Sequence, residues 1–159
     1  SFSAATSLGG IGRIGQGLSM YSHSVTVHKN PDNLNNPYMV VRHYDSDVLD
    51  IYKFNGSAIE IVKTGVSLPT SIPIISGNLR TYKEIKFTGN NVYLITDRDK
   101  NLYKLSGSTF VIDKADLTAA GEYISAIEST KNGILVSVVK TLLTKPQPKT
   151  VSDVVLIPN

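Results

Sequence analysis

The sequence predicts an all-β fold built from antiparallel meanders, and three observations support this prediction. β-branched and aromatic residues dominate apolar runs that are short, as is typical of strands. Turns rich in Asn, Asp and Gly separate these runs, and such residues tolerate the positive φ of tight hairpins. A pattern of strand, turn, strand, turn and strand occurs in Tyr38–Val62 and again in Asn91–Asp113. We therefore expect strands and hairpins throughout most of the chain.

The amino-acid composition limits the kinds of site and partner that this protein can have. The 159 residues suit one domain that can bury a core without further crosslinks. Cysteine is absent, which excludes disulfides and thiolate metal sites. The 16 basic and 13 acidic residues are spread along the chain, and no run approaches the roughly 18 apolar residues of a membrane-spanning helix. We therefore expect neither a nucleic-acid partner nor membrane insertion.

The N-terminal segment differs from the rest of the chain. Residues 1–24 form a Gly/Ser-rich arm, and residues 25–159 form a single β-rich domain. Because glycine-rich backbone is costly to order, we expect a flexible arm that becomes ordered by docking on a neighbour. The arm contains a formal GxGxxG motif at residues 10–15, but no buried strand precedes it and no good helix follows. We therefore expect no dinucleotide and no other cofactor. The chain begins with Ser1, which indicates a processed product, a trimmed chain or an excerpt of a longer one.

The expected strands follow the arm in chain order. They are Ser24–His28, Tyr38–Tyr44, Leu49–Phe54, Ala58–Lys63, Tyr82–Phe87, Val92–Thr96, Leu102–Leu105, Thr109–Asp113, Ile134–Lys140 and Val151–Ile157. One short helix is expected near Ala115–Tyr123, although Gly121 weakens it. The two prolines in Gly65–Gly77 favour a connection across the surface or an edge strand. Lys145–Lys149 is expected to form an exposed turn between the last two strands.

The two similar stretches have nearly one period. The repeat units span about residues 38–63 and 82–113, and the second becomes a four-stranded meander when Tyr82–Phe87 is included. Three pairs of landmarks lie 51, 52 and 51 residues apart: Tyr52 and Tyr103, Asp45 and Asp97, Ile59 and Phe110. Such units do not bury their faces alone, so we expect the meanders to pack on neighbours.

This repeat resembles a β-propeller blade, with a period close to the roughly 50 residues of kelch-type repeats. The chain accommodates two blades, or three if Tyr123–Lys140 begins another, whereas closed propellers have about four to eight. The resemblance implies a ring completed by other copies or by further sequence; the alternative is a β-sandwich. The strand pattern, the Gly-rich beginning and the absence of cysteine are also similar to tail, fibre or head-decoration proteins of tailed bacteriophages. That similarity implies a virion component.

Candidate chemistry is sparse. Asp97, Asp99 and Asn101 alternate as in calcium loops, but Leu102 stands where such loops need glycine. We therefore expect aspartates that cap hairpin turns, and no metal site. The histidines, His23, His28 and His43, do not converge in this pattern, and no GxSxG nucleophile motif is present.

The leading functional hypothesis is a noncatalytic structural or interaction subunit of a larger assembly. Its partners would be other protein subunits or copies of itself. The alternative is a module that binds a surface glycan or a receptor through exposed tyrosines, and a hydrolytic enzyme comes third. The candidate contact residues are Gly9, Gly10, Arg13, Tyr21, Tyr38 and Tyr44.

Overall fold

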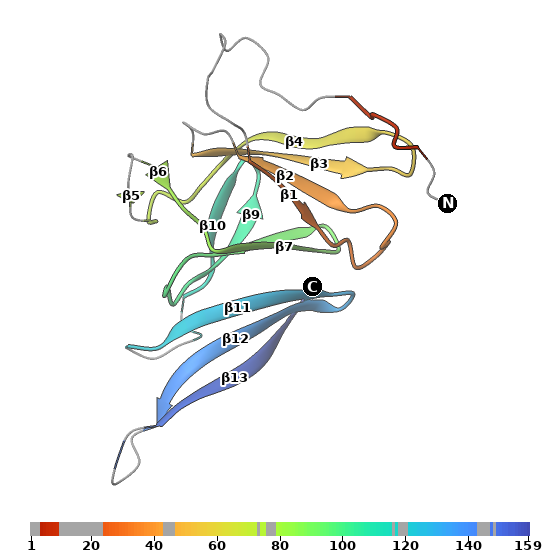
Figure 1. Cartoon of the computed structure of the whole chain (residues 1–159). Coiled ribbons are helices and arrows are strands. Elements are labelled where there is room, and N and C mark those ends of the chain that lie inside the picture. Colours follow the sequence, from red (N-terminus) through yellow and green to blue (C-terminus); the bar gives the residue numbers. More distant parts are fainter. Residues whose placement is uncertain are drawn as a thin grey trace.

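The computed structural model of the chain describes residues 4–9, 24–42, 47–72, 74–75, 79–115, 117, 121–142, 147 and 149–159. These residues form thirteen strands and no helix, so the predicted all-β class is confirmed (Figure 1). No helix in the described part of the chain has the length and apolar character needed to cross a membrane.

An eight-stranded sheet contains both repeat units. Its order is β1-β2-β3-β4-β10-β9-β8-β7, and all neighbours are antiparallel except β4 and β10, which share one parallel pair, Ser67 and Thr109. The sheet is therefore two meanders joined at one point. The strand bounds are β1 Ser24–His28, β2 Tyr38–Arg42, β3 Val48–Phe54, β4 Ile59–Ser67, β7 Glu84–Thr88, β8 Asn91–Ile95, β9 Leu102–Ser106 and β10 Thr109–Lys114.

The eight-stranded sheet curls into a nearly closed barrel, because its two edge strands approach each other. The ring of Tyr38, at the start of β2, stacks on Phe87 of β7 with centroids 4.2 Å apart. The ring of His28, at the end of β1, lies 5.7 Å from the same Phe87 ring. These aromatic contacts bring the β1 and β7 edges together without a ladder of backbone hydrogen bonds.

A second sheet has the order β11-β12-β13 and packs beside β7, below the barrel in Figure 1. Its strands are β11 Tyr123–Thr130, β12 Gly133–Leu142 and β13 Lys149–Pro158. Two side chains at the start of β7 form hydrogen bonds with the free backbone edge of β11. Lys83 Nζ donates to the carbonyl oxygen of Ser125 at 2.6 Å, and the N–H of Ile127 donates to Glu84 Oε2 at 2.8 Å. Side chains thus satisfy backbone groups that would otherwise invite another strand.

The β7–β10 meander contributes to a core on each of its faces. Leu94 and Tyr103 lie in the first core, between the two meanders, whereas Tyr93, Ile95 and Leu102 lie in the second, against β11–β13. Neighbouring residues of one strand point to opposite faces, so β8 serves both cores. The chain is consequently layered, with β1–β4, β7–β10 and β11–β13 in succession.

Two of the sequence-based expectations need correction. The connection at residues 65–77 does not lie only on the surface, because Val66, Leu68 and Ile72 are buried in the first core. A short pair of strands follows this connection, β5 (Ile74–Ile75) with β6 (Leu79–Arg80). The helix expected at residues 115–123 is not found among the described residues of that stretch, and Tyr123 instead begins β11. The strand that begins there buries Ile124 and Ile127 in the second core.

Candidate functional site

The outer face of the first meander carries a row of apolar side chains. The strand register places Val27, Met39, Tyr52 and Ile61 side by side across β1, β2, β3 and β4. Their neighbours of opposite parity, such as Val40, point into the first core. Val27 and Ile61 remain 68% and 67% exposed, at the two ends of the row. With Val25 these residues form what we call the β1–β4 face.

The outer face of β11–β13 is also apolar. Ala126, Leu135, Val154 and Leu156 lie on it, because the strands pair Ala126 with Ser137, Ser137 with Val154, and Leu135 with Leu156. Val154 is 62% exposed and Leu156 is 48% exposed. We call this surface the β11–β13 face.

A shallow groove runs where the β11–β13 face meets β7. Its volume is about 310 Å³, and Glu84 and Lys86 of β7 form one wall. Lys86 Nζ lies 3.7 Å from Glu128 Oε2, an ion pair at the margin of the groove. The groove therefore has an apolar floor and a charged rim, an arrangement typical of protein interfaces.

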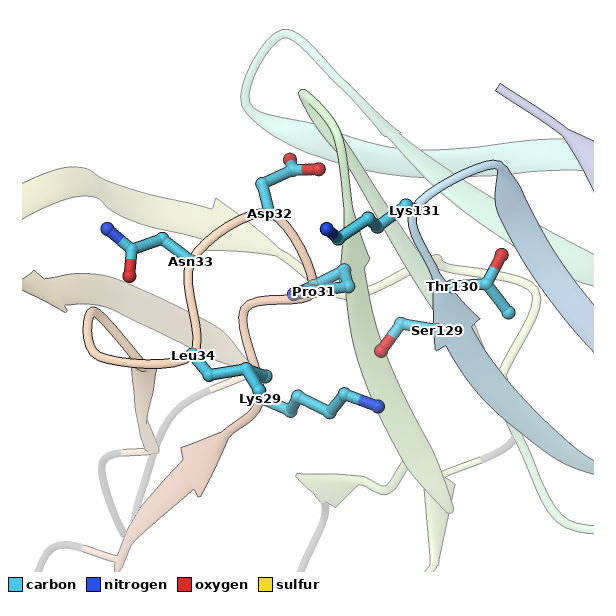
Figure 2. A pocket seen from close by; sticks show the side chains of 8 residues that line it. All are labelled: Lys29, Pro31, Asp32, Asn33, Leu34, Ser129, Thr130 and Lys131. Atoms are coloured by element: carbon cyan, nitrogen blue, oxygen red, sulfur yellow. The ribbon is translucent and has the colours of Figure 1, made fainter.

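A larger hollow separates the loop after β1 from the turn between β11 and β12 (Figure 2). Its volume is about 560 Å³. Figure 2 shows the Lys131 side chain pointing toward the loop that carries Asp32, and Lys29 extending below Ser129. Ser129 is buried, and its backbone N–H donates to Glu128 Oε1. The lining combines charged groups of both signs with the exposed Leu34, and it contains no aromatic ring on which a sugar could stack.

His28 lies in a small hollow between the barrel edges, lined also by Thr26, Tyr82 and Glu84. Its ring Nε2 is 2.8 Å from Thr26 Oγ1. Burial, with a smaller contribution from the charge of Lys86, lowers the pKa of His28 from 6.5 to about 4, so the imidazole is neutral at pH 7. Glu84, the acid of this hollow, accepts the N–H of Ile127 through Oε2. A neutral imidazole hydrogen-bonded to a hydroxyl could transfer a proton. The Glu84 carboxylate, however, is bound to the backbone of β11 and so holds that strand in place.

The aspartate-rich turn at residues 97–101 is organised by one carboxylate. Asp99 Oδ1 accepts the backbone N–H of Asn101 at 3.1 Å, and Oδ2 accepts the hydroxyls of Thr96 at 3.1 Å and Tyr103 at 2.8 Å. This is the turn-capping role that the sequence predicts. No group of three or more His, Cys, Asp or Glu side chains in the described part of the chain is placed to hold a metal ion.

The predicted contact residues fall on different parts of the chain. Gly9 is exposed and has a φ of 101°. Tyr38 is half-buried, because its ring stacks on Phe87 and packs against the first core. Burial also raises the pKa of the Tyr38 hydroxyl. The other four, Gly10, Arg13, Tyr21 and Tyr44, lie outside the described residues.

The residues of the two apolar faces were not among the predicted contacts. The sequence does contain a signal for the β11–β13 face. The run Val154-Val155-Leu156-Ile157 would place apolar side chains on both faces of a strand. Such continuous runs are typical of strands covered on both faces. Here one parity fills a core and the other remains exposed.

Comparison with known protein families, with curated proteins and with solved structures gave no match. The functional assignment therefore depends on the surfaces of this chain.

Proposed function

We propose that this protein is a noncatalytic structural subunit that assembles with copies of itself through its exposed sheet faces. The observation that carries the proposal is the presence of an apolar face at each end of the layered fold, the β1–β4 face and the β11–β13 face. Contiguous exposed apolar surface is a marker of protein association, because its removal from water stabilises the complex by roughly 25 cal/mol per Å².

The setting that we propose is a virion of the tailed-bacteriophage type, on the basis of the sequence resemblance. A structural role there needs repeated contacts between copies, and exposed apolar sheet faces can supply such contacts. The residue 1–24 arm would add a second contact to the neighbour.

Sedimentation velocity across a wide concentration range tests the proposal. We expect the weight-average sedimentation coefficient to rise with protein concentration. A high salt concentration should lower it only modestly, because salt screens charges and has little effect on apolar contacts. A chain that sediments as a monomer at every concentration would overturn it. A truncated chain without residues 1–19 measures the contribution of the arm separately.

The second candidate is a receptor-binding module that uses the hollow in Figure 2. Two lysines, Lys29 and Lys131, border this hollow beside the exposed Leu34, which favours a peptide segment with an acidic and an apolar side chain. Binding to a peptide array that is lost in Lys131→Ala, with Lys149→Ala as the control outside the hollow, would support it. Equal binding by both variants would exclude it.

A further inference from the structure

The chain contains two Asn-Gly pairs, and the structure gives them different surroundings. Asn-Gly pairs are prone to deamidation, because glycine has no Cβ to hinder attack of its backbone nitrogen on the asparagine amide carbon. One pair, Asn55-Gly56, lies in the turn between β3 and β4. The other, Asn132-Gly133, lies in the turn between β11 and β12. The two can therefore be compared within one molecule.

The Asn55 side chain forms hydrogen bonds through both polar atoms of its amide. Oδ1 accepts the N–H of Ala58 at 2.8 Å, the N–H of Ser57 at 2.9 Å and the Ser57 hydroxyl at 3.2 Å. Nδ2 donates to the Glu60 carboxylate. The three donors surround the oxygen that becomes negatively charged when a nucleophile adds to Asn55 Cγ. The turn therefore forms an oxyanion hole around its own asparagine.

The attacking group, the backbone nitrogen of Gly56, is free to react. Gly56 is exposed, and the described part of the chain shows no acceptor for its N–H. The space beside its Cα is also open, since a Cβ there would have only Asn36 Oδ1 within reach, at 4.0 Å. The Gly56 peptide can therefore rotate toward Asn55 without displacing a neighbour. Because the two groups are adjacent in the chain, their reaction is an intramolecular ring closure.

The second Asn-Gly pair is held in place by β13. Gly133 pairs with Pro158, and a Cβ on Gly133 would lie 2.1 Å from the carbonyl oxygen of Ile157. The carbonyl oxygen of Asn132 accepts the N–H of Asn159 at 3.0 Å, which fixes the peptide that would have to rotate. Among the described residues, none donates a hydrogen bond to Asn132 Oδ1. This pair therefore has neither the mobile nucleophile nor the oxyanion hole.

We propose that Asn55 is a site of spontaneous deamidation, and that the native β3–β4 turn accelerates the reaction. The Gly56 nitrogen loses its proton to hydroxide and forms a bond to Asn55 Cγ. The Cγ–Nδ2 bond then breaks, and Nδ2 takes a proton from water and leaves as ammonia, which regenerates hydroxide. Water opens the resulting succinimide at either carbonyl and gives aspartate or isoaspartate at residue 55. Overall, one water is consumed and one ammonia is released.

The product differs from the original chain in charge and, for isoaspartate, in backbone length. The net charge falls by one unit, from +3 to +2. The new carboxylate lies beside Glu60, which accepted a hydrogen bond from the amide before the reaction, so attraction is replaced by repulsion. Isoaspartate also inserts a methylene group into the turn that closes the Phe54–Ile59 pair. We therefore expect the reaction to weaken the β3–β4 hairpin.

Peptide mapping by mass spectrometry measures the reaction at both asparagines in one sample. The full chain is incubated in mildly alkaline buffer, once folded and once in guanidinium chloride, and is then digested at acidic pH, where deamidation is slow. The rate at each site in the folded chain is divided by the rate at the same site in the unfolded chain. This ratio removes the effect of the neighbouring sequence. We expect a ratio above one at Asn55 and well below one at Asn132.

Two serine variants test the oxyanion hole. Ser57→Ala removes the hydroxyl donor and keeps both backbone donors, so it should lower the ratio at Asn55 by about three- to tenfold. Ser108→Ala is the matched control, because Ser108 lies 51 residues later, in the corresponding Gly-Ser turn of the second repeat unit, and is also exposed. This control should leave the ratio unchanged.

The possible outcomes separate the proposal from its alternatives. A ratio above one at Asn55 cannot result from transient unfolding, because the unfolded chain supplies the reference rate. A ratio of one or less at Asn55 would overturn the proposal, since the native turn would then leave the amide unactivated or protect it. If Ser57→Ala and Ser108→Ala have the same effect on the ratio, the oxyanion hole is wrong.

Discussion

The carboxylate of Asp99 should be a main determinant of stability, and Asp99→Ala tests this. The substitution removes the acceptor for one backbone N–H and for the hydroxyls of Thr96 and Tyr103. Thr96 and Tyr103 are 4% and 1% exposed, so water does not readily replace the carboxylate. The Tyr103 hydroxyl keeps its hydrogen bonds with Ser71 Oγ, at 3.1 Å, and with the Asn101 side chain, whereas the described part of the chain shows no second partner for Thr96 Oγ1.

These contacts give the expected magnitude. A hydrogen bond to a charged group contributes about 1.5–3 kcal/mol, and a neutral one contributes about 0.5–1.5 kcal/mol. Discounting for the partly exposed carboxylate and for the remaining Ser71 contact, we expect Asp99→Ala to lower the free energy of unfolding by about 3 kcal/mol. Tyr103→Phe, which removes only the hydroxyl, should cost about 1 kcal/mol.

Urea unfolding, followed by circular dichroism, measures both effects. With an m-value of about 2 kcal/mol/M, Asp99→Ala should lower the midpoint by about 1.5 M. The double variant Asp99→Ala/Tyr103→Phe should be less destabilised than the sum of the single variants by about 1 kcal/mol, because both remove the same bond. Additive effects would refute the shared bond. A wild-type midpoint that rises on addition of Ca²⁺, with no rise in Asp99→Ala, would show that the turn is a calcium loop rather than a cap.

Three further predictions concern the barrel and the second sheet. Since the pKa of His28 is lowered from 6.5 to about 4, the unfolded state binds the proton more tightly, and stability should be complete above pH 6.5 and fall as the pH drops toward 4. In His28→Asn, the urea midpoint should depend less on pH between 4 and 6.5. An unchanged slope would contradict the lowered pKa of His28. Gly133→Ala should destabilise far more than Gly107→Ala in thermal unfolding, because a Cβ at residue 133 would lie 2.1 Å from the Ile157 carbonyl oxygen while residue 107 has open space. Tyr38→Ala should lower the free energy of unfolding by about 3 kcal/mol through loss of its core packing, and a variant as stable as wild type would return Tyr38 to the exposed contact residues.

The sequence predicted most strands closely because their determinants are local. Ser24–His28 coincides with β1, and Thr109–Asp113 differs from β10 by one residue. Alternation, β-branched residues and turn chemistry act over a few residues, so they can be recognised without a fold. At the turn after β3, for example, Asn55 Oδ1 accepts the N–H groups of Ser57 and Ala58, as the hairpin chemistry of Asn-Gly predicts.

The candidate surfaces were harder to predict, because exposure is decided by neighbours distant in the sequence. Tyr38 was expected on an exposed surface, yet Phe87, 49 residues later in the chain, covers its ring. The connection at residues 65–77 has the prolines of a surface segment, but Leu68 and Ile72 fill the space inside the curled sheet. Neither contact has a local signature.

By itself, the sequence determined the all-β class, the strand positions and the duplication of the meander, since each follows from residue type and spacing along the chain. Only the tertiary structure decided which face of each meander is covered. Tyr52 and Tyr103 occupy the same position in the two copies, yet Tyr103 is buried and Tyr52 is partly exposed. The residue, the strand and the turn are alike, and the difference is that a layer packs against the second copy at this face and none of the described layers packs there against the first.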